Sequence, residues 1–123
     1  SELPVASLRH WFVGTMDLLC EVNGKQVIAD LKTGKAVYEE MGMQLAAYNC
    51  AYWEMTEEQE NPIKQRIIIR IGNEAKDFEI RYFPYYEDDI RTFLACKQIY
   101  EWKKFSKKKY MEEQKNELEK RNK

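Results

Sequence analysis

The chain has 123 residues, of which 44% are hydrophobic and 33% charged, so one globular domain is expected and a disordered chain is excluded. No run approaches the roughly 20 apolar residues that a membrane helix needs. The sequence begins with Ser and lacks the features of a signal peptide, so we expect a cytoplasmic, intracellular protein that is cut from something longer or trimmed from a tag. Cys20, Cys50 and Cys96 lie far apart within apolar stretches, which predicts reduced, buried thiols and not metal ligands.

The charge is spread unevenly along the chain. The net charge is −1 overall, but residues 103–123 hold nine Lys or Arg and four Glu, a net of +5, so residues 1–102 carry −6. We expect residues 103–123 to form a charged helical tail on which Lys104, Lys107 and Lys108 share a face that could meet phosphates. The alternative is that this mixed-sign helix end is a solvated surface.

Hydrophobic periodicity predicts a hairpin and then a helix. Residues 10–22 read as one strand and residues 26–33 as a second, joined by the tight turn Asn23-Gly24. Apolar residues then recur at steps of three and four from residue 38 to about residue 55, which predicts an amphipathic helix. Asn61-Pro62 ends that segment.

Two more strands and a long helix are predicted after this. The strands are residues 65–71 and 77–83, the first with a continuous apolar run that suggests cover on both faces, the second with a half-exposed alternation. Three acids at residues 87–89 mark the start of a last helix whose apolar stripe continues past Phe105. The order predicts an α+β fold in which one sheet backs onto helices.

Two acids lie inside strands that otherwise read as buried. Asp17 lies six residues before the turn and Asp30 six residues after it, so antiparallel pairing brings them to one level, roughly 5 Å apart if they face the same way. Alternation puts Asp30 and Lys32 on one face. Two carboxylates this close repel each other unless a cation lies between them, and oxygen ligands favour Mg²⁺ or Mn²⁺. Alternatively, Asp30 and Lys32 form a surface ion pair and Asp17 caps a bend.

Three short motifs follow one another between residues 14 and 48. They are Gly14-Thr15-Met16-Asp17, Ile28-Ala29-Asp30-Leu31-Lys32-Thr33-Gly34 and Gln44-Leu45-Ala46-Ala47-Tyr48. In this order and spacing they resemble the signatures of RecB-type nucleases in the PD-(D/E)XK superfamily, a pattern similar to that of phage recombination exonucleases. The resemblance implies a single domain over residues 1–123 with a restriction-endonuclease-like core, a mixed sheet of about four strands, flanking helices and a long C-terminal helix.

The resemblance also implies which residues carry the chemistry. Asp17 and Asp30 would bind the divalent metal, Mg²⁺ or Mn²⁺, together with the backbone carbonyl of Leu31. Lys32 would orient or activate the attacking water. Glu2 resembles an accessory acid found in some members.

Further residues are implied to support this centre. Gln44 and Tyr48, one turn apart on a helix, would brace the site and touch the DNA backbone, with a core aromatic as the alternative for Tyr48. Thr33 would support the metal-binding residues without binding the metal itself. The upstream helix that carries an extra ligand in many RecB-type members is expected to be absent. His10 reads as a packing residue at a strand start and not as a substitute ligand.

Taken together, these features predict a metal-dependent nuclease that hydrolyses DNA phosphodiester bonds. The resemblance implies an exonuclease of recombination, repair or phage DNA processing, phage- or prophage-encoded, that acts on single- or double-stranded DNA as a homo-oligomer or as part of a larger recombination protein. One alternative is a catalytically silent nucleic-acid- or protein-binding module with the same fold, and another is a small structural domain. No Ser–His–Asp or Cys–His set competes, because the sequence has one histidine.

Overall fold

The structure, a computed structural model, describes residues 2–122. In chain order its elements are β1 (Leu3–Ser7), β2 (Phe12–Met16), β3 (Leu18–Val22), β4 (Lys25–Thr33), α1 (Glu40–Thr56), β5 (Ile63–Ile71), β6 (Phe78–Tyr82) and α2 (Tyr86–Arg121). The chain divides into two compact units, Ser1–Phe93 and Leu94–Lys123, and the boundary falls within α2. Every element before α2 therefore belongs to the first unit.

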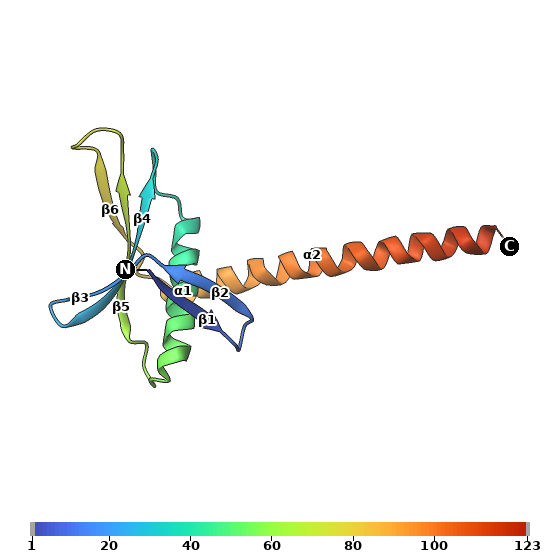
Figure 1. Ribbon diagram of the computed structural model, residues 1–123, viewed down its shortest axis with the longest axis horizontal. Helices are drawn as coiled ribbons and strands as arrows, with labels where there is room; N and C mark the ends of the chain where they lie inside the picture. Colours follow the sequence, from blue (N-terminus) through green and yellow to red (C-terminus); the bar gives the residue numbers. More distant parts are fainter. Residues whose placement is uncertain (1, 123) are drawn as a thin grey trace. The chain divides into compact units, whose positions relative to one another are not determined.

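Strands β3 to β6 form a mixed sheet in the order β3-β4-β5-β6. The pairs β3–β4 and β5–β6 are antiparallel, whereas β4 and β5 are parallel. A parallel pair needs a crossover connection, which α1 supplies. This helix packs beside the sheet and also contacts the separate β1–β2 hairpin (Figure 1). The predicted α+β fold, with a mixed four-stranded sheet and a long C-terminal helix, is confirmed.

The hydrophobic core lies between the sheet and α1. Ile28 of β4 and Ile68 of β5 are fully buried, as is Leu45 of α1, and all three belong to one cluster. Because side chains alternate along a strand, Asp30 and Lys32 face the same side as Ile28. The core packing of β4 therefore directs this acid and this lysine toward α1.

The N-terminal region differs from the single strand predicted for residues 10–22. The chain instead forms β2 and β3, which belong to different sheets, and the break falls at Asp17. At this residue the chain stops pairing with β1 and starts pairing with β4. His10 lies in the turn between β1 and β2, where its N–H donates to Ser7 Oγ at 3.1 Å, and not at the start of a strand.

The outer face of the sheet also differs from the prediction. Within the isoleucine run of β5 only Ile68 is fully buried, so this strand is not covered on both faces. The alternation along β6 is present, but Arg81 faces the core side because its Nη1 donates to the Val37 carbonyl at 3.0 Å. The apolar side chains of β6 are consequently the exposed ones: Phe78, Ile80 and Tyr82.

The helices and cysteines complete the picture. The helix predicted for residues 38 to 55 is confirmed as α1, and the acids at residues 87–89 fill the first turn of α2 as expected. All three cysteines are free, but Cys20 and Cys50 are only half-buried and Cys96 is exposed. The prediction of a buried thiol is therefore wrong for Cys96, which lies on an exposed part of α2. Among the described residues, no helix is long and apolar enough to cross a membrane.

Candidate active site

The β3–β4 hairpin brings two acids together. Asn23 and Gly24 both have positive φ, 52° and 78°, as the tightest hairpin turns require. The register that follows pairs Leu18 with Ala29, so Asp17 and Asp30 lie at the next level along the two strands. The local sequence thus fixes the relative position of the two carboxylates.

The two acids have opposite pKa shifts. Burial raises the pKa of Asp30, which is 4% exposed, and the neighbouring Asp17 carboxylate adds to the rise. Hydrogen bonding with Asp30 lowers the pKa of Asp17, and so does the N–H of Leu31, which donates to Asp17 Oδ2 at 3.1 Å. Asp30 is therefore the harder of the two acids to ionise.

One oxygen of Asp30 has an unsatisfied position. Its Oδ2 lies 2.9 Å from Lys32 Nζ as an ion pair, but the angles are not those of a hydrogen bond, and this buried oxygen accepts none. A buried acceptor without a hydrogen bond costs free energy. A cation held between Asp17 and Asp30 would satisfy it, so the residues present fit a hard divalent ion.

The protein supplies few ligands for such an ion. Among residues 2–122, no three His, Cys, Asp or Glu side chains lie close enough together to hold a metal. Mg²⁺ tolerates this, because it usually binds one or two carboxylates and takes its other ligands from water and substrate phosphate.

A chain of hydrogen bonds holds Lys32. Its Nζ donates to Gln44 Oε1 at 3.0 Å, and Gln44 Nε2 donates to the hydroxyl of Tyr48 at 2.8 Å. Gln44 and Tyr48 lie one turn apart on α1 and so share a face. The Lys32 side chain is 29% exposed, which leaves its ammonium accessible to a ligand while α1 fixes its position.

Gly14 allows Tyr48 to lie against β2. A Cβ at position 14 would stand 2.5 Å from Cε1 of the Tyr48 ring, closer than side chains pack. Burial raises the pKa of the Tyr48 hydroxyl, so the group stays a neutral phenol whose oxygen accepts the bond from Gln44. Tyr48 also packs against the hydrophobic core, so it is a core aromatic and also part of the brace, the hydrogen-bond chain of Tyr48 and Gln44 that holds Lys32.

The sequence profile of the PD-(D/E)XK nuclease superfamily matches residues 2–121. The chain belongs to this superfamily. Its members are usually nucleases, which bind nucleic acid and generally use divalent metals. The Asp17–Asp30 pair and Lys32 occupy adjoining positions in this chain's structure.

The chain is also similar to solved structures. The protein described as "Crystal structure of SSO0001" aligns with a TM-score of 0.45 at 19% sequence identity, over 71% of this chain and 40% of that one. The present chain thus spans less than half the length of that protein. No curated protein sequence matches the chain.

Of two other residues implied by the superfamily resemblance, Thr33 lies apart from the acid pair and Glu2 lies level with Asp17. Thr33 is exposed, and alternation along β4 turns it away from Asp30. Glu2 is exposed and directly precedes β1, whose Leu3 pairs with Met16, so it lies at the same end of the hairpin as Asp17.

The basic residues proposed for phosphate contact lie in the second unit. Lys104, Lys107 and Lys108 are all exposed on α2. The Nζ of Lys104 lies 5.7 Å from the centroid of the Tyr100 ring on the same helix. Their role in binding stays a prediction.

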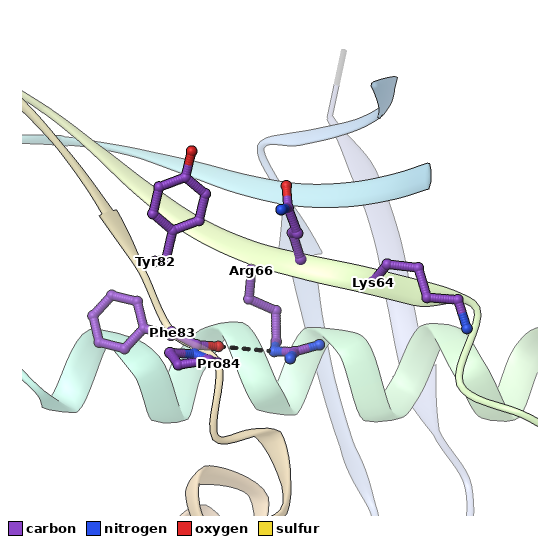
Figure 2. A pocket seen from close by; sticks show the side chains of 6 residues that line it. Lys64, Arg66, Tyr82, Phe83 and Pro84 are labelled. Atoms are coloured by element: carbon purple, nitrogen blue, oxygen red, sulfur yellow. Dashed lines mark hydrogen bonds between the residues drawn. The ribbon is translucent and has the colours of Figure 1, made fainter. Parts of the chain in front are cut away.

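Arg66 is a buried charge that the sequence analysis did not single out. Its Nε donates to the Phe83 carbonyl at 3.3 Å and its Nη1 to Asn49 Oδ1 at 2.8 Å, beside a small pocket of about 220 Å³ (Figure 2). Burial lowers the pKa of the guanidinium. Through these two bonds Arg66 joins β5 to α1 and to the segment between β6 and α2.

Arg70 was also missed, and it lies closer to the site. It is the register partner of Lys32 across the parallel β4–β5 pair, and its Nη1 donates to the Gly34 carbonyl at 3.1 Å. Asp77 and Glu79 hold its other nitrogens at 2.9 and 3.2 Å. Arg70 therefore anchors the end of β4 next to Lys32. The sequence feature that could have identified Arg70 is a charged residue inside an isoleucine-rich strand.

Proposed function

We propose that the chain is a Mg²⁺- or Mn²⁺-dependent deoxyribonuclease that hydrolyses phosphodiester bonds. The observation that carries this proposal is the pair of carboxylates at one level of the β3–β4 hairpin, Asp17 and the buried Asp30, with the Lys32 ammonium 2.9 Å from Asp30 Oδ2. A purely structural site would gain little from two adjacent carboxylates, one of them buried. A site that binds a cation and a phosphate uses the same arrangement.

In this proposal each residue has a distinct role. Asp17, at the break between β2 and β3, and Asp30 of β4 would hold the ion. When bound, a divalent ion supplies Lewis-acid activation of water and offsets charge on the phosphate. Lys32 orients the attacking water and adds positive charge where the transition state becomes more negative. Gln44, itself held by Tyr48, restricts the rotamers of the lysine.

The finer assignment is also part of this proposal. We infer a RecB-type exonuclease of recombination, repair or phage DNA processing, because the three motifs between residues 14 and 48 have that order and spacing. The same proposal includes the substrate, single- or double-stranded DNA, and the assembly, either a homo-oligomer or part of a larger recombination protein.

The test is a digestion assay on labelled single- and double-stranded DNA with Mg²⁺, with Mn²⁺ and with a chelator. We expect cleavage only with metal, and a loss of about 100-fold or more in Lys32→Ala. Lys25→Ala is the matched control, because it removes an exposed lysine from the same strand. Metal binding and folding should survive in Lys32→Ala, and full activity in that variant would overturn its role.

A catalytically silent binding module is the second candidate. The observation in its favour is that no three metal-ligating side chains gather among residues 2–122. It predicts nucleic-acid binding without cleavage at any metal concentration. The same assay, paired with a binding measurement, separates the two functions.

A further inference from the structure

A cavity of about 580 Å³ adjoins the residues that brace Lys32. Its wall is largely aromatic and apolar, with Phe12, Tyr38, Tyr48, Phe93, Met41 and Met43 among its lining residues. Gln44 and Tyr48 line the cavity and also belong to the hydrogen-bond chain that ends on Lys32. The cavity is therefore adjacent to the candidate active site and shares Gln44 and Tyr48 with it.

The chemistry of the lining selects against phosphate. Glu40 is the ionic side chain among the residues that line the cavity, and its negative charge repels a phosphate group. Aromatic faces stack well on flat heterocycles, and the amide of Gln44 and the tyrosine hydroxyls offer hydrogen bonds to ring edges. A cavity of this size with an apolar wall and few polar groups suits a small organic ligand.

The aromatic walls are already in position. Phe12 and Phe93 pack edge to face, with ring centroids 5.1 Å apart. The ring of Tyr48 lies over Gly14. Tyr38 is 57% exposed, so much of its surface is available to a ligand. A ring entering the cavity thus meets surfaces that need little rearrangement.

We propose that this cavity receives an unpaired nucleobase from the strand whose phosphate lies at Asp17, Asp30 and Lys32. A base within a duplex is stacked and paired, so it cannot enter without being extruded. The substrate class that fits is therefore single-stranded DNA, including a frayed end. This inference rests on the proposed nuclease function and specifies its substrate.

The test compares strands that lack one base. Equilibrium binding of the 123-residue chain is measured, with a chelator present to prevent cleavage, for labelled single strands of about 12 nucleotides, each carrying an abasic residue at a different position. One position should lower the affinity by roughly 5- to 100-fold, the loss expected for one stacked base. Phosphates are unchanged across the series, so the base alone is tested.

The variants locate that base in the cavity. In Tyr38→Ala the intact strand should bind with a similar loss, and the sensitive abasic position should add less than about two-fold more. Tyr38→Phe keeps the ring and should bind normally. Tyr85→Ala is the control, because Tyr85 is 70% exposed and does not line the cavity. The scan with unmodified protein is decisive even if Tyr38→Ala does not fold.

The outcomes separate this inference from the nuclease proposal. A flat abasic scan, with metal-dependent cleavage of blunt duplex as fast as of single strands, overturns the cavity assignment and leaves the nuclease standing. If one abasic position lowers the affinity, if this loss is absent in Tyr38→Ala, and if no metal supports cleavage, the cavity assignment is supported and the nuclease proposal is overturned. If the chain neither binds nor cleaves DNA, both proposals are overturned.

Discussion

At the scale of single residues, Asp30 lies where its charge is disfavoured. The side chain is buried, its pKa is raised by that burial, and one oxygen accepts no hydrogen bond. Asp17 lies beside it with a lowered pKa. A buried charge of this kind lowers the stability of the fold, and a cation bound by the two acids would restore it.

A neutral side chain at position 30 should abolish the stabilisation by metal. We expect Mn²⁺ to raise the melting temperature of the unmodified chain, with a gain of about 3 kcal/mol at a hundred times the dissociation constant. In Asp30→Asn the gain should vanish, because the amide is a poor ligand for a hard cation. Thermal melts at increasing Mn²⁺ measure this. Asp88→Asn, which changes an exposed acid of α2, should keep the gain.

Gly14 offers a second test on a single residue. Gly14→Ala should displace the Tyr48 ring and loosen the brace on Lys32, which lowers the turnover rate between about 10- and 100-fold with a smaller change in KM. Thr15→Ala is the matched control, because it changes an exposed neighbour on the same strand. Normal turnover in Gly14→Ala would show that the ring position does not matter.

At the scale of elements, much of the fold could be predicted from local pattern. The Asn23-Gly24 turn predicted the β3–β4 hairpin, and the steps of three and four predicted α1. β1 was missed because Pro4 lies inside a five-residue strand and reads as a loop. The break at Asp17 was missed because the apolar pattern runs across it unchanged, although pairing switches there from β1 to β4.

The candidate site was also predictable in part, namely where it depends on local sequence. Spacing from the turn predicted that Asp17 and Asp30 lie at one level. The bond from Lys32 to Gln44 depends on how α1 packs on the sheet, which no local pattern encodes. Arg70 was missed for a similar reason, since its partners come from a loop and the next strand.

Glu54 joins two elements, the β1–β2 turn and α1. Its carboxylate accepts from Ser7 Oγ at 2.6 Å and from the N–H groups of Leu8 and Arg9, both at 2.9 Å. The bond from Ser7 is the main cause that lowers the pKa of Glu54 below its ordinary value of 4.5. The charged form is thus favoured by folding, so its stabilisation is present above pH 4.5 and is lost as pH falls through the lowered pKa.

Replacement of Glu54 should therefore have a pH-dependent effect. Glu54→Gln should lower the free energy of unfolding by about 1 kcal/mol at neutral pH, a modest value because the site is partly solvated. The difference from the unmodified chain should shrink below pH 4.5. Urea unfolding at several pH values measures it, with Glu60→Gln, an exposed acid, as the control. A difference that is constant with pH would contradict this account.

At the scale of the whole molecule, charge is divided along the sequence. Residues 103–123 carry a net +5 and residues 1–102 a net −6. The basic part is exposed helix in the second unit. Such a surface suits phosphate contact without sequence preference, and it equally suits simple solvation.

Changing three lysines decides between these roles. Replacing Lys104, Lys107 and Lys108 with Gln should weaken DNA binding uniformly across sequences and reduce the slope of log affinity against log salt by up to about three. Turnover at saturating DNA should stay the same. Lys115→Gln with Lys120→Gln, farther along α2, is the comparison. An unchanged slope for the triple variant would mean that these lysines form a solvated surface.

The register of the β3–β4 hairpin limits which insertions and deletions the chain tolerates. The two-residue turn is already the shortest, so removal of Gly24 cannot be absorbed by the loop and must shift the pairing by one residue. Asp17 would then stand opposite Ala29 or Leu31, and Asp30 would no longer share its level. Residues 73–76, in the loop between β5 and β6, carry no such constraint on the acids. Length variation is thus compatible with the chemistry at that loop and incompatible with it at the turn.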